Sequence, residues 1–427
     1  MVDEPSSAQT HTATPHPRAI LFLQGLATPF FATLAHILAE QDHQIHRVHF
    51  CGGDQLFSGP AHKNIHHHAY QGTPDGLPAF YQALLSGKHI DTVLLFGDCR
   101  PVHTHMRSLA EAHGAKLYVF EEGYIRPGWV TMEAGGTNGF SRMPHSMKGI
   151  ATLFEDAPHK SRCTLPAVAT DMRRRALMDI AAHGANMLHK FRFPHYRTHR
   201  PATLGEEAVG WIKRGWSTLR HGGENKRTIK RFELGDEPYF LAPLQLNSDY
   251  QIREHSRFSG MVEFIEETLT SFAHHAPKDS ALFFKNHPLD NGMINYRGII
   301  SRMAAQLGIA ARVGFAAGGN LDLLLRKTRG VVLVNSTVGF KALSLYRPMK
   351  VLGRAVYDIE GLTDPQPLDS FWQKPLLPQQ RLADEFLTVV ENYTQVRGDL
   401  FSKAGIALAA QEAARVITGE KPRLPQN

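Results

Sequence analysis

The stretch Ser280-Ala-Leu-Phe-Phe-Lys-Asn-His-Pro288 decides how we interpret this chain. Its apolar half, which contains no acidic group, is typical of a parallel strand buried on both faces of a sheet. In open α/β sheets ligands bind outside the carboxyl ends of the strands, so Lys285 and His287 stand where a substrate would bind. Pro288 stops further strand pairing and stiffens the turn that presents His287. A strand that runs into an ordinary polar loop is the alternative interpretation.

The length and composition of the chain predict a cytoplasmic protein of two or three domains. Its 427 residues are 42% hydrophobic, which is enough for full cores. No apolar run approaches the roughly 18 residues of a membrane span. Residues 1–17, rich in Ser, Thr, His and Pro, predict a disordered lead-in rather than a secretory signal. Cys51, Cys99 and Cys163 have no paired spacing, so we expect reduced thiols instead of a disulfide framework or a zinc ribbon.

Residues 18–145 predict an N-terminal Rossmann-like domain. The segment RAILFLQG at 18–25 is typical of a buried strand, a helix with Pro29 at its first position follows, and a strand over 45–50 returns. Strands over 91–96 and 116–120 then deliver Asp98 and the pair Glu121-Glu122 to one edge of the sheet. Two carboxylates at a strand end can bind a ribose or act as acid or base, and a solvated acidic turn is the alternative.

Two segments of this domain are expected to be loops. One carries His62, His66, His67 and His68, and we do not expect a metal site there because adjacent imidazole rings cannot easily converge on one ion. The other, over residues 129–141, is rich in glycine and predicts a long active-site loop.

Residues 146–236 predict a helical, basic insertion. Between Asp171 and Arg231 there are 14 lysines and arginines against five acidic residues, which suits an anionic partner. Helices are expected over 171–190 and 204–219, and the second, with Trp211 and Trp216 among basic residues, is typical of an interfacial membrane helix. A helical layer between domains with a merely solvated basic face is the alternative. No recognisable nucleic-acid-binding module accompanies the charge.

Residues 237–360 predict a second Rossmann-like domain. A strand over 239–246 carries Gln245 at its end, and a strand over 330–334 runs into Asn335-Ser336-Thr337-Val338-Gly339 and a helix. Small hydroxyls and a glycine at a helix start suit a phosphate, because free backbone N–H groups and the helix dipole point at it. Two further helices, near 382–393 and 402–417, are expected to pack residues 361–427 back onto the domains.

The expected fold is therefore α/β, with two Rossmann-like domains that face a cleft lined by polar groups at strand ends. This layout is typical of nucleotide-sugar transferases. No Gly-x-Gly-x-x-Gly follows a strand and no Walker loop or Gly-x-Ser-x-Gly elbow occurs, which disfavours dinucleotide oxidoreductases and P-loop kinases. We find no Asp-x-Asp to hold a divalent metal, and we expect no metal and no cofactor.

Five segments together resemble the bacterial capsule polysaccharide biosynthesis proteins. They are Phe96-Gly-Asp-Cys-Arg-Pro101, Phe120-Glu-Glu-Gly-Tyr-Ile-Arg-Pro127, Gln245-Leu-Asn-Ser-Asp-Tyr250, Lys285-Asn-His-Pro288 and Asn335-Ser-Thr-Val-Gly339. The chain is more narrowly similar to the single-domain Kdo transferases that start the lipid-linked linker of ATP-exported capsules. The resemblance runs from about residue 18 to residue 350. It implies a GT-B-like enzyme that moves Kdo from CMP-β-Kdo to lyso-phosphatidylglycerol.

The resemblance also assigns roles to residues. It implies that His287 and the Ser336-Thr337 pair contact the CMP phosphate, with Lys285 as a further cation. Gln245, Pro288, Asn335 and Gly339 are expected to belong to the same donor-binding site. Gln245 and Asp249 have the spacing of related β-Kdo transferases, in which the Asp is a covalent nucleophile, and a double displacement explains net retention.

The acidic pair of this chain departs from the related pattern. Larger two-domain relatives have Trp-Glu-Asp-Gly where this chain has Phe-Glu-Glu-Gly, which leaves open how Glu121 and Glu122 divide a donor-binding and an acid/base role. Asp98 is a reserve general base, and Arg253 and Arg257, just after Asp249, are candidates for the sugar carboxylate.

The partners implied are CMP-Kdo, the lyso-phosphatidylglycerol acceptor, the inner face of the inner membrane, a second Kdo transferase and the capsule assembly and export complex, but no nucleic acid. A non-catalytic export or scaffold protein that binds capsule polymer is one alternative. A transferase for another CMP-linked acid sugar, such as sialic acid, is another.

Overall fold

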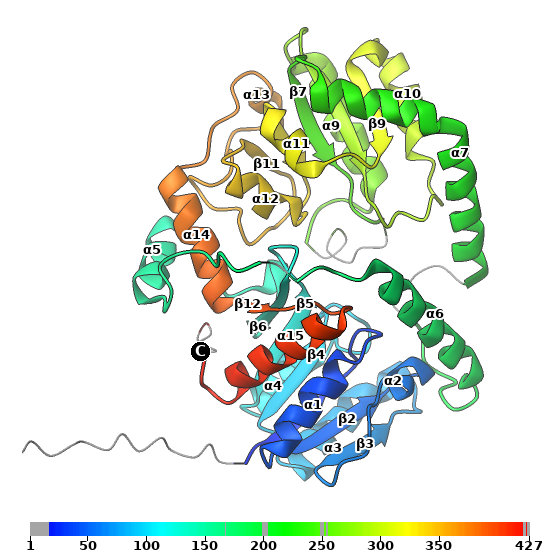
Figure 1. Cartoon of the computed structure of the whole chain (residues 1–427), viewed down its shortest axis with the longest axis vertical. Helices are drawn as coiled ribbons and strands as arrows, with labels where there is room; N and C mark the ends of the chain where they lie inside the picture. Colours follow the sequence, from blue (N-terminus) through cyan, green and yellow to red (C-terminus); the bar gives the residue numbers. More distant parts are fainter. Residues whose placement is uncertain are drawn as a thin grey trace, which may run out of the picture.

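The computed structural model describes residues 17–166, 168–198, 204–247, 252, 255–421 and 424. Residues 1–16 of the expected lead-in lie outside this part of the chain. The described chain is an α/β protein with two parallel-rich sheets, which lie at opposite ends of the molecule in Figure 1.

The N-terminal sheet has seven strands within the described residues, in the order β12-β6-β5-β4-β1-β2-β3. They are β1 (Ala19–Phe22), β2 (Gln44–His49), β3 (Ile65–Ala69), β4 (Thr92–Phe96), β5 (Lys116–Glu122), β6 (Trp129–Ala134) and β12 (Gln395–Arg397). The run from β3 to β5 is parallel, whereas β6 is antiparallel to β5 and to β12. All five residues of β4 are buried, as expected for a parallel strand that is covered on both faces.

Helices cover both faces of this sheet. One face packs against α1 (Phe30–Glu40) and α15 (Lys403–Ile417), and the other against α3 (Leu77–Gly87) and α4 (Met106–Ala112). The hydroxyl of Thr28 accepts a hydrogen bond from the backbone N–H of Phe30 at 3.3 Å, which helps to start α1. Figure 1 shows α15, the last helix of the chain, beside α1, the first.

Within the part of the chain that the structure describes, the C-terminal sheet has five parallel strands in the order β11-β10-β7-β8-β9. They are β7 (Tyr239–Pro243), β8 (Ala281–Asn286), β9 (Val313–Ala317), β10 (Gly330–Leu333) and β11 (Met349–Val351). One face carries α9 (Met261–His275), α10 (Tyr296–Gln306) and α13 (Leu368–Phe371). The other carries α7 (Leu204–Leu234), α11 (Leu321–Lys327), α12 (Val338–Ser344) and α14 (Gln380–Tyr393). The stretch that opened the sequence analysis is thus β8, a central strand of this sheet.

Two expectations for the N-terminal half are wrong. Residues 129–141 are not one long loop, because β6 forms an antiparallel hairpin with β5; the glycines that suggested a loop follow the strand and do not interrupt it. The histidine segment is not a loop either, because residues 65–69 form the edge strand β3. Its imidazoles stack on those of β2, and the closest pairs, His46 with His68 and His49 with His67, have ring nitrogens 3.0 and 2.8 Å apart.

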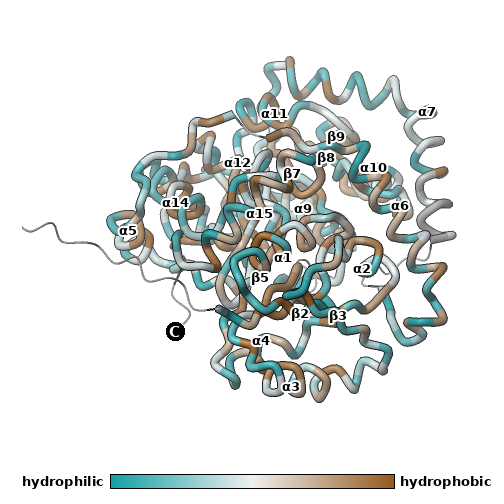
Figure 2. The backbone as a smooth tube through the Cα atoms, turned by 60° about the horizontal axis from the view of Figure 1, so that its bottom comes forward, coloured by the Kyte–Doolittle hydropathy of each residue, from teal (hydrophilic) through white to brown (hydrophobic). Residues whose placement is uncertain are grey.

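The connection between the two sheets contains α5 (Met147–Asp156), α6 (Met172–Leu188) and α7. The sequence predicted that the last of these helices ends near Leu219, but α7 continues to Leu234 and buries Phe232 against Phe283 of β8. Figure 2 shows α7 on the outer edge of the molecule, with hydrophobic and hydrophilic residues mixed along it. No helix within the described ranges is long and apolar enough to cross a membrane.

Helix α6 has one face on protein and one face in solvent. Its buried face packs against α2 (Gly52–Leu56), where the carbonyl oxygen of Ala185 lies 2.1 Å from the place that a Cβ on Gly52 would occupy. The opposite side carries five large hydrophobic side chains that are 65% to 96% exposed: Leu177, Ile180, Met187, Leu188 and, just after the helix, Phe191. We call these five residues the α6 stripe.

Candidate functional site

The carboxyl edge of the C-terminal sheet presents Lys285 and His287. Lys285 lies inside β8 and is 8% exposed, and burial lowers the pKa of its ammonium group, while Glu233 opposes the shift. His287 follows directly after the strand. The prediction that β8 ends in these polar side chains is therefore confirmed, although the strand runs slightly further than expected, through Asn286.

The imidazole of His287 is arranged as a neutral hydrogen-bond donor. Its Nδ1 accepts a hydrogen bond from the backbone N–H of Leu289 at 3.1 Å, so the neutral ring carries its proton on Nε2. Burial and the nearby charge of Arg126 lower the pKa of His287 to about 4. The ring is therefore uncharged near pH 7.

Helix α7 holds the loop that follows His287. The guanidinium of Arg214 donates to the carbonyl oxygen of Pro288 at 2.6 Å and also to that of Asp290. Asp290 in turn accepts a hydrogen bond from the side chain of Asn286 at 3.0 Å. At this point the basic face of the insertion is not merely solvated, because one of its arginines braces the predicted phosphate site.

Two neighbouring strand ends are tied together by a pair of amides. Gln245 follows β7 and is 6% exposed; its Nε2 donates to Asn335 Oδ1 at 3.0 Å, and its Oε1 accepts from the backbone N–H of Asn335 at 3.3 Å. These bonds fix the start of the turn that carries Ser336 and Thr337, just before α12. Gln245 and the Asn335-Ser336-Thr337 run therefore lie at one edge of the sheet.

Gly339 is required by close packing in the first turn of α12. A Cβ at this position would lie 2.3 Å from the ring of Tyr357, whose hydroxyl donates to the carbonyl oxygen of Ser336 at 2.6 Å. A larger residue would push apart the turn and the tyrosine that supports it.

At the end of β5, Glu122 is held by two arginines. Arg175, from the first turn of α6, donates to it through Nη2 at 2.6 Å and Nη1 at 3.2 Å, and Arg126 Nη1 lies 3.1 Å from its Oε2. Burial acts to raise the pKa of Glu122, but the charges of Arg126 and Arg175 outweigh it and lower that pKa. The residue after Glu122 is a glycine, Gly123, because a Cβ at this position would lie 2.1 Å from the carbonyl oxygen of Trp129 on β6.

The other two predicted carboxylates have different surroundings. Oε1 of Glu121 lies above Gly97, beside the guanidinium of Arg100, and Gly97 has a φ of +74° that favours glycine. Asp98 is engaged by its neighbours, because Oδ2 accepts from Arg107 at 2.7 Å and from the backbone N–H of Thr137 at 3.2 Å.

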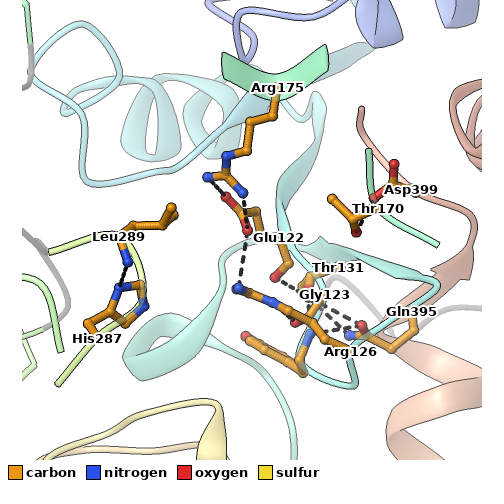
Figure 3. Close-up of polar contacts among 11 residues, drawn as sticks. Glu122, Gly123, Arg126, Thr131, Thr170, Arg175, His287, Leu289, Gln395 and Asp399 are labelled. Carbon is orange, nitrogen blue, oxygen red and sulfur yellow. Dashed lines mark hydrogen bonds and ion pairs between the residues drawn. The ribbon is translucent and has the colours of Figure 1, made fainter. Parts of the chain in front are cut away.

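The edges of the two sheets meet at this site. His287 lies across from Glu122 and Arg126 in Figure 3, and the charges of Glu122, Arg126, Arg175 and Lys285 all act on the pKa of His287. Tyr124, two residues after Glu122, stacks on Phe340 of α12 with ring centroids 4.9 Å apart. The structure thus brings together predicted residues from both halves of the chain.

The predicted nucleophile Asp249 and the candidate Arg253 lie outside the described residues. Two site residues were missed from the sequence. Arg126 stands inside the quoted segment Phe120–Pro127, so its motif could have signalled it. Arg175 is one of three successive arginines, and no sequence pattern distinguishes it from its neighbours.

A separate cavity of about 510 Å³ contains none of the predicted site residues. It is lined by Trp129, most of the segment 158–165, the end of α14, Arg397 of β12, and residues on and just after α15.

Comparison with known proteins identifies the same family that the sequence motifs resemble. Residues 91–401 match the family model described as capsule polysaccharide biosynthesis protein. The chain belongs to this family. The matched range includes β4, β5, β7, β8 and β10, the five strands that carry the described candidate site residues at or just after their ends.

Relatives in this family cover nearly the whole chain. The capsule polysaccharide export protein KpsS of Escherichia coli is 35% identical over 88% of this chain and 95% of its own length. The capsule polysaccharide modification protein LipB of Neisseria meningitidis serogroup A is 33% identical over 90% of this chain and 92% of its own. Among solved structures, the β-Kdo 2,7 transferase KpsC of Thermosulfurimonas dismutans aligns over 95% of this chain and all of its own, with a TM-score of 0.41 and 12% identity.

Proposed function

We propose that this chain is a GT-B glycosyltransferase that moves Kdo from CMP-β-Kdo to a lyso-phosphatidylglycerol acceptor and so starts the β-Kdo linker of capsular polysaccharide. The observation that carries the proposal is the meeting of His287 and Lys285, at the end of β8, with Glu122, at the end of β5. Membership of the capsule biosynthesis family supports the choice of pathway.

The C-terminal side binds the nucleotide. The Nε2–H of His287, the ammonium of Lys285 and the hydroxyls of Ser336 and Thr337 stabilise the phosphate as it leaves, because charge-assisted hydrogen bonds strengthen while negative charge develops. Gln245 acts as a positioning residue, since its bonds to Asn335 hold the start of that turn.

The chemistry is a double displacement. The carboxylate of Asp249 attacks the anomeric carbon of Kdo, and the bond to the CMP phosphate breaks with its electron pair on CMP. The acceptor hydroxyl then attacks the same carbon and releases Asp249, while its proton passes to Glu121. We assign this base role to Glu121, which adjoins Glu122 near the end of β5.

The acceptor is a lipid, and the α6 stripe is the surface that we assign to the membrane. Five exposed hydrophobic side chains, with Arg173 and Arg174 on α6 and Lys190 and Arg192 just after it, suit the interface of an anionic bilayer. Because Arg175 extends from this helix to Glu122, a membrane-bound α6 would lie next to the active site.

The test is mass spectrometry of synthetic lyso-phosphatidylglycerol after incubation with CMP-Kdo generated in situ. We expect wild-type protein to add one Kdo and Asp249→Ala to add none. Thermal unfolding at an unchanged temperature would show that the variant is folded. A folded wild-type protein that adds neither Kdo nor sialic acid from its CMP donor would refute the proposal and favour a non-catalytic role in export.

A further inference from the structure

Three side chains at the end of β5 form a cluster with an excess of positive charge. Arg126 and Arg175 both pair with Glu122, and Arg126 Nε also donates to the carbonyl oxygen of Gly123 at 2.8 Å. Two guanidinium charges and one carboxylate leave one positive charge at this point of the cleft. One arginine is enough to neutralise Glu122, so the positive charge of the second arginine can bind another anionic group.

Both guanidiniums also have N–H groups beyond those used in the bonds described above. Each has five N–H groups, and the bonds above use two on each arginine. In the part of the chain that the structure describes, neither arginine pairs with a second carboxylate. The orientation of Arg175 is fixed further because it lies over the ring of Phe401, with 4.4 Å between its Cζ and the ring centroid, and that of Arg126 by its bond to the carbonyl oxygen of Gly123.

We propose that Arg126 and Arg175 bind the carboxylate of the acidic donor sugar, and that Glu122 is a positioning residue that holds the two guanidiniums in place. This inference rests on the proposed function. Planar guanidiniums recognise carboxylates through paired N–H groups, which a lysine cannot reproduce.

The place of the cluster fits the chemistry of such a sugar. In Kdo the carboxylate is attached to the anomeric carbon, the carbon that also bears the phosphate. The groups that bind these two anions must therefore be neighbours. The phosphate is assigned to His287 and Lys285 on the C-terminal side, and the arginine cluster faces His287 from the N-terminal side (Figure 3).

The experiment compares the binding of free Kdo and of its carboxyl methyl ester, in the presence of CMP, by saturation-transfer NMR. Wild-type protein should bind the acid at least ten-fold more tightly than the ester. Arg126→Ala and Arg175→Ala should lose this preference, and Arg175→Lys should not restore it. The matched control is Arg381→Ala, which removes an exposed arginine that pairs with Glu385 on α14 and should keep the preference.

Two further readouts separate this inference from the proposed function. CMP affinity should stay unchanged in both arginine variants, which also shows that they are folded. In the transfer assay these variants should raise the KM for CMP-Kdo and leave the KM for the lipid acceptor unchanged. Equal binding of acid and ester by wild-type protein, or a rise in the acceptor KM alone, would overturn the inference even if transfer occurs. Discrimination between acid and ester without any transfer would count against the proposed function alone.

Discussion

Removal of the imidazole of His287 should weaken CMP binding by a predictable amount. The structure leaves its Nε2–H as one donor to the phosphate, and a hydrogen bond to a charged group contributes about 1.5–3 kcal/mol. His287→Ala should therefore raise the Kd for CMP about 10- to 150-fold, at about 1.4 kcal/mol per factor of ten. His287→Gln, whose amide can place an N–H near the same point, should recover part of the loss.

The pH dependence of CMP binding tests whether His287 is neutral or protonated when it contacts the phosphate. The pKa of His287 is lowered to about 4, so the ring is neutral throughout the range from pH 7 to pH 9 and donates from Nε2 at every point. Isothermal titration calorimetry should give a Kd for wild-type protein that hardly changes across this range. A Kd that rises steadily above pH 7 in wild-type protein but not in His287→Gln would mean that an imidazolium binds the phosphate, whereas a rise in both would come from another group, such as Lys285, whose pKa is also lowered by burial. A Kd that is unchanged in His287→Ala would remove this residue from the site.

Three other predictions follow from described contacts. Burial lowers the pKa of His46 to about 4 and that of His49 to about 3. As the pH falls below about 6.5, these histidines therefore take up protons in the unfolded protein before they do so in the folded protein. The free energy of unfolding should fall by about 1.4 kcal/mol per pH unit for each histidine as the pH drops toward 4. When urea unfolding is measured at several pH values, the free energy of unfolding should depend less steeply on pH in the variant with both histidines changed to Gln. The same dependence on pH in variant and wild type would contradict the lowered pKa values. Leu177→Glu with Ile180→Glu should reduce binding to phosphatidylglycerol vesicles at least ten-fold in a sedimentation assay while CMP affinity is kept, and full binding by this variant would exclude the α6 stripe as the membrane surface. Gly339→Ala should destabilise the protein by about 1–3 kcal/mol in thermal unfolding, because the new methyl group would overlap a tyrosine ring at 2.3 Å, and a neutral effect would show that this turn tolerates movement.

Most strands of both sheets could be predicted because they are short apolar runs that end in polar residues. β8 and β10 are examples, and their ends supply Lys285, His287 and Ser336. The hairpin strand β6 was missed because glycines that follow it were taken as evidence against any regular element. Its own residues, WVTMEA, include the β-branched residues that favour strands.

The arginine cluster could not be predicted, for a different physical reason. Glu122 was identified as acidic and functional, but its partner Arg175 reaches it from a helix 53 positions further along the chain. Local pattern indicates which residues are at a strand end, whereas the pairing of distant charges depends on how the connection between the sheets folds back. The contacts of Glu122 with Arg126 and Arg175 therefore became visible only with the structure.

The return of the chain's last segment to the first sheet has a consequence for synthesis on the ribosome. β12 pairs with β6, α15 fills the core beside α1, and the side chain of Arg18 donates to the carbonyl oxygen of Ile417 at 2.5 Å. The first strands of the N-terminal sheet are thus made early, but part of its core must stay uncovered until β12 and α15 have been synthesised. We expect the second sheet, which is continuous in sequence from β7 to β11, to fold earlier, so that the later half of the chain becomes stable before the half that precedes it.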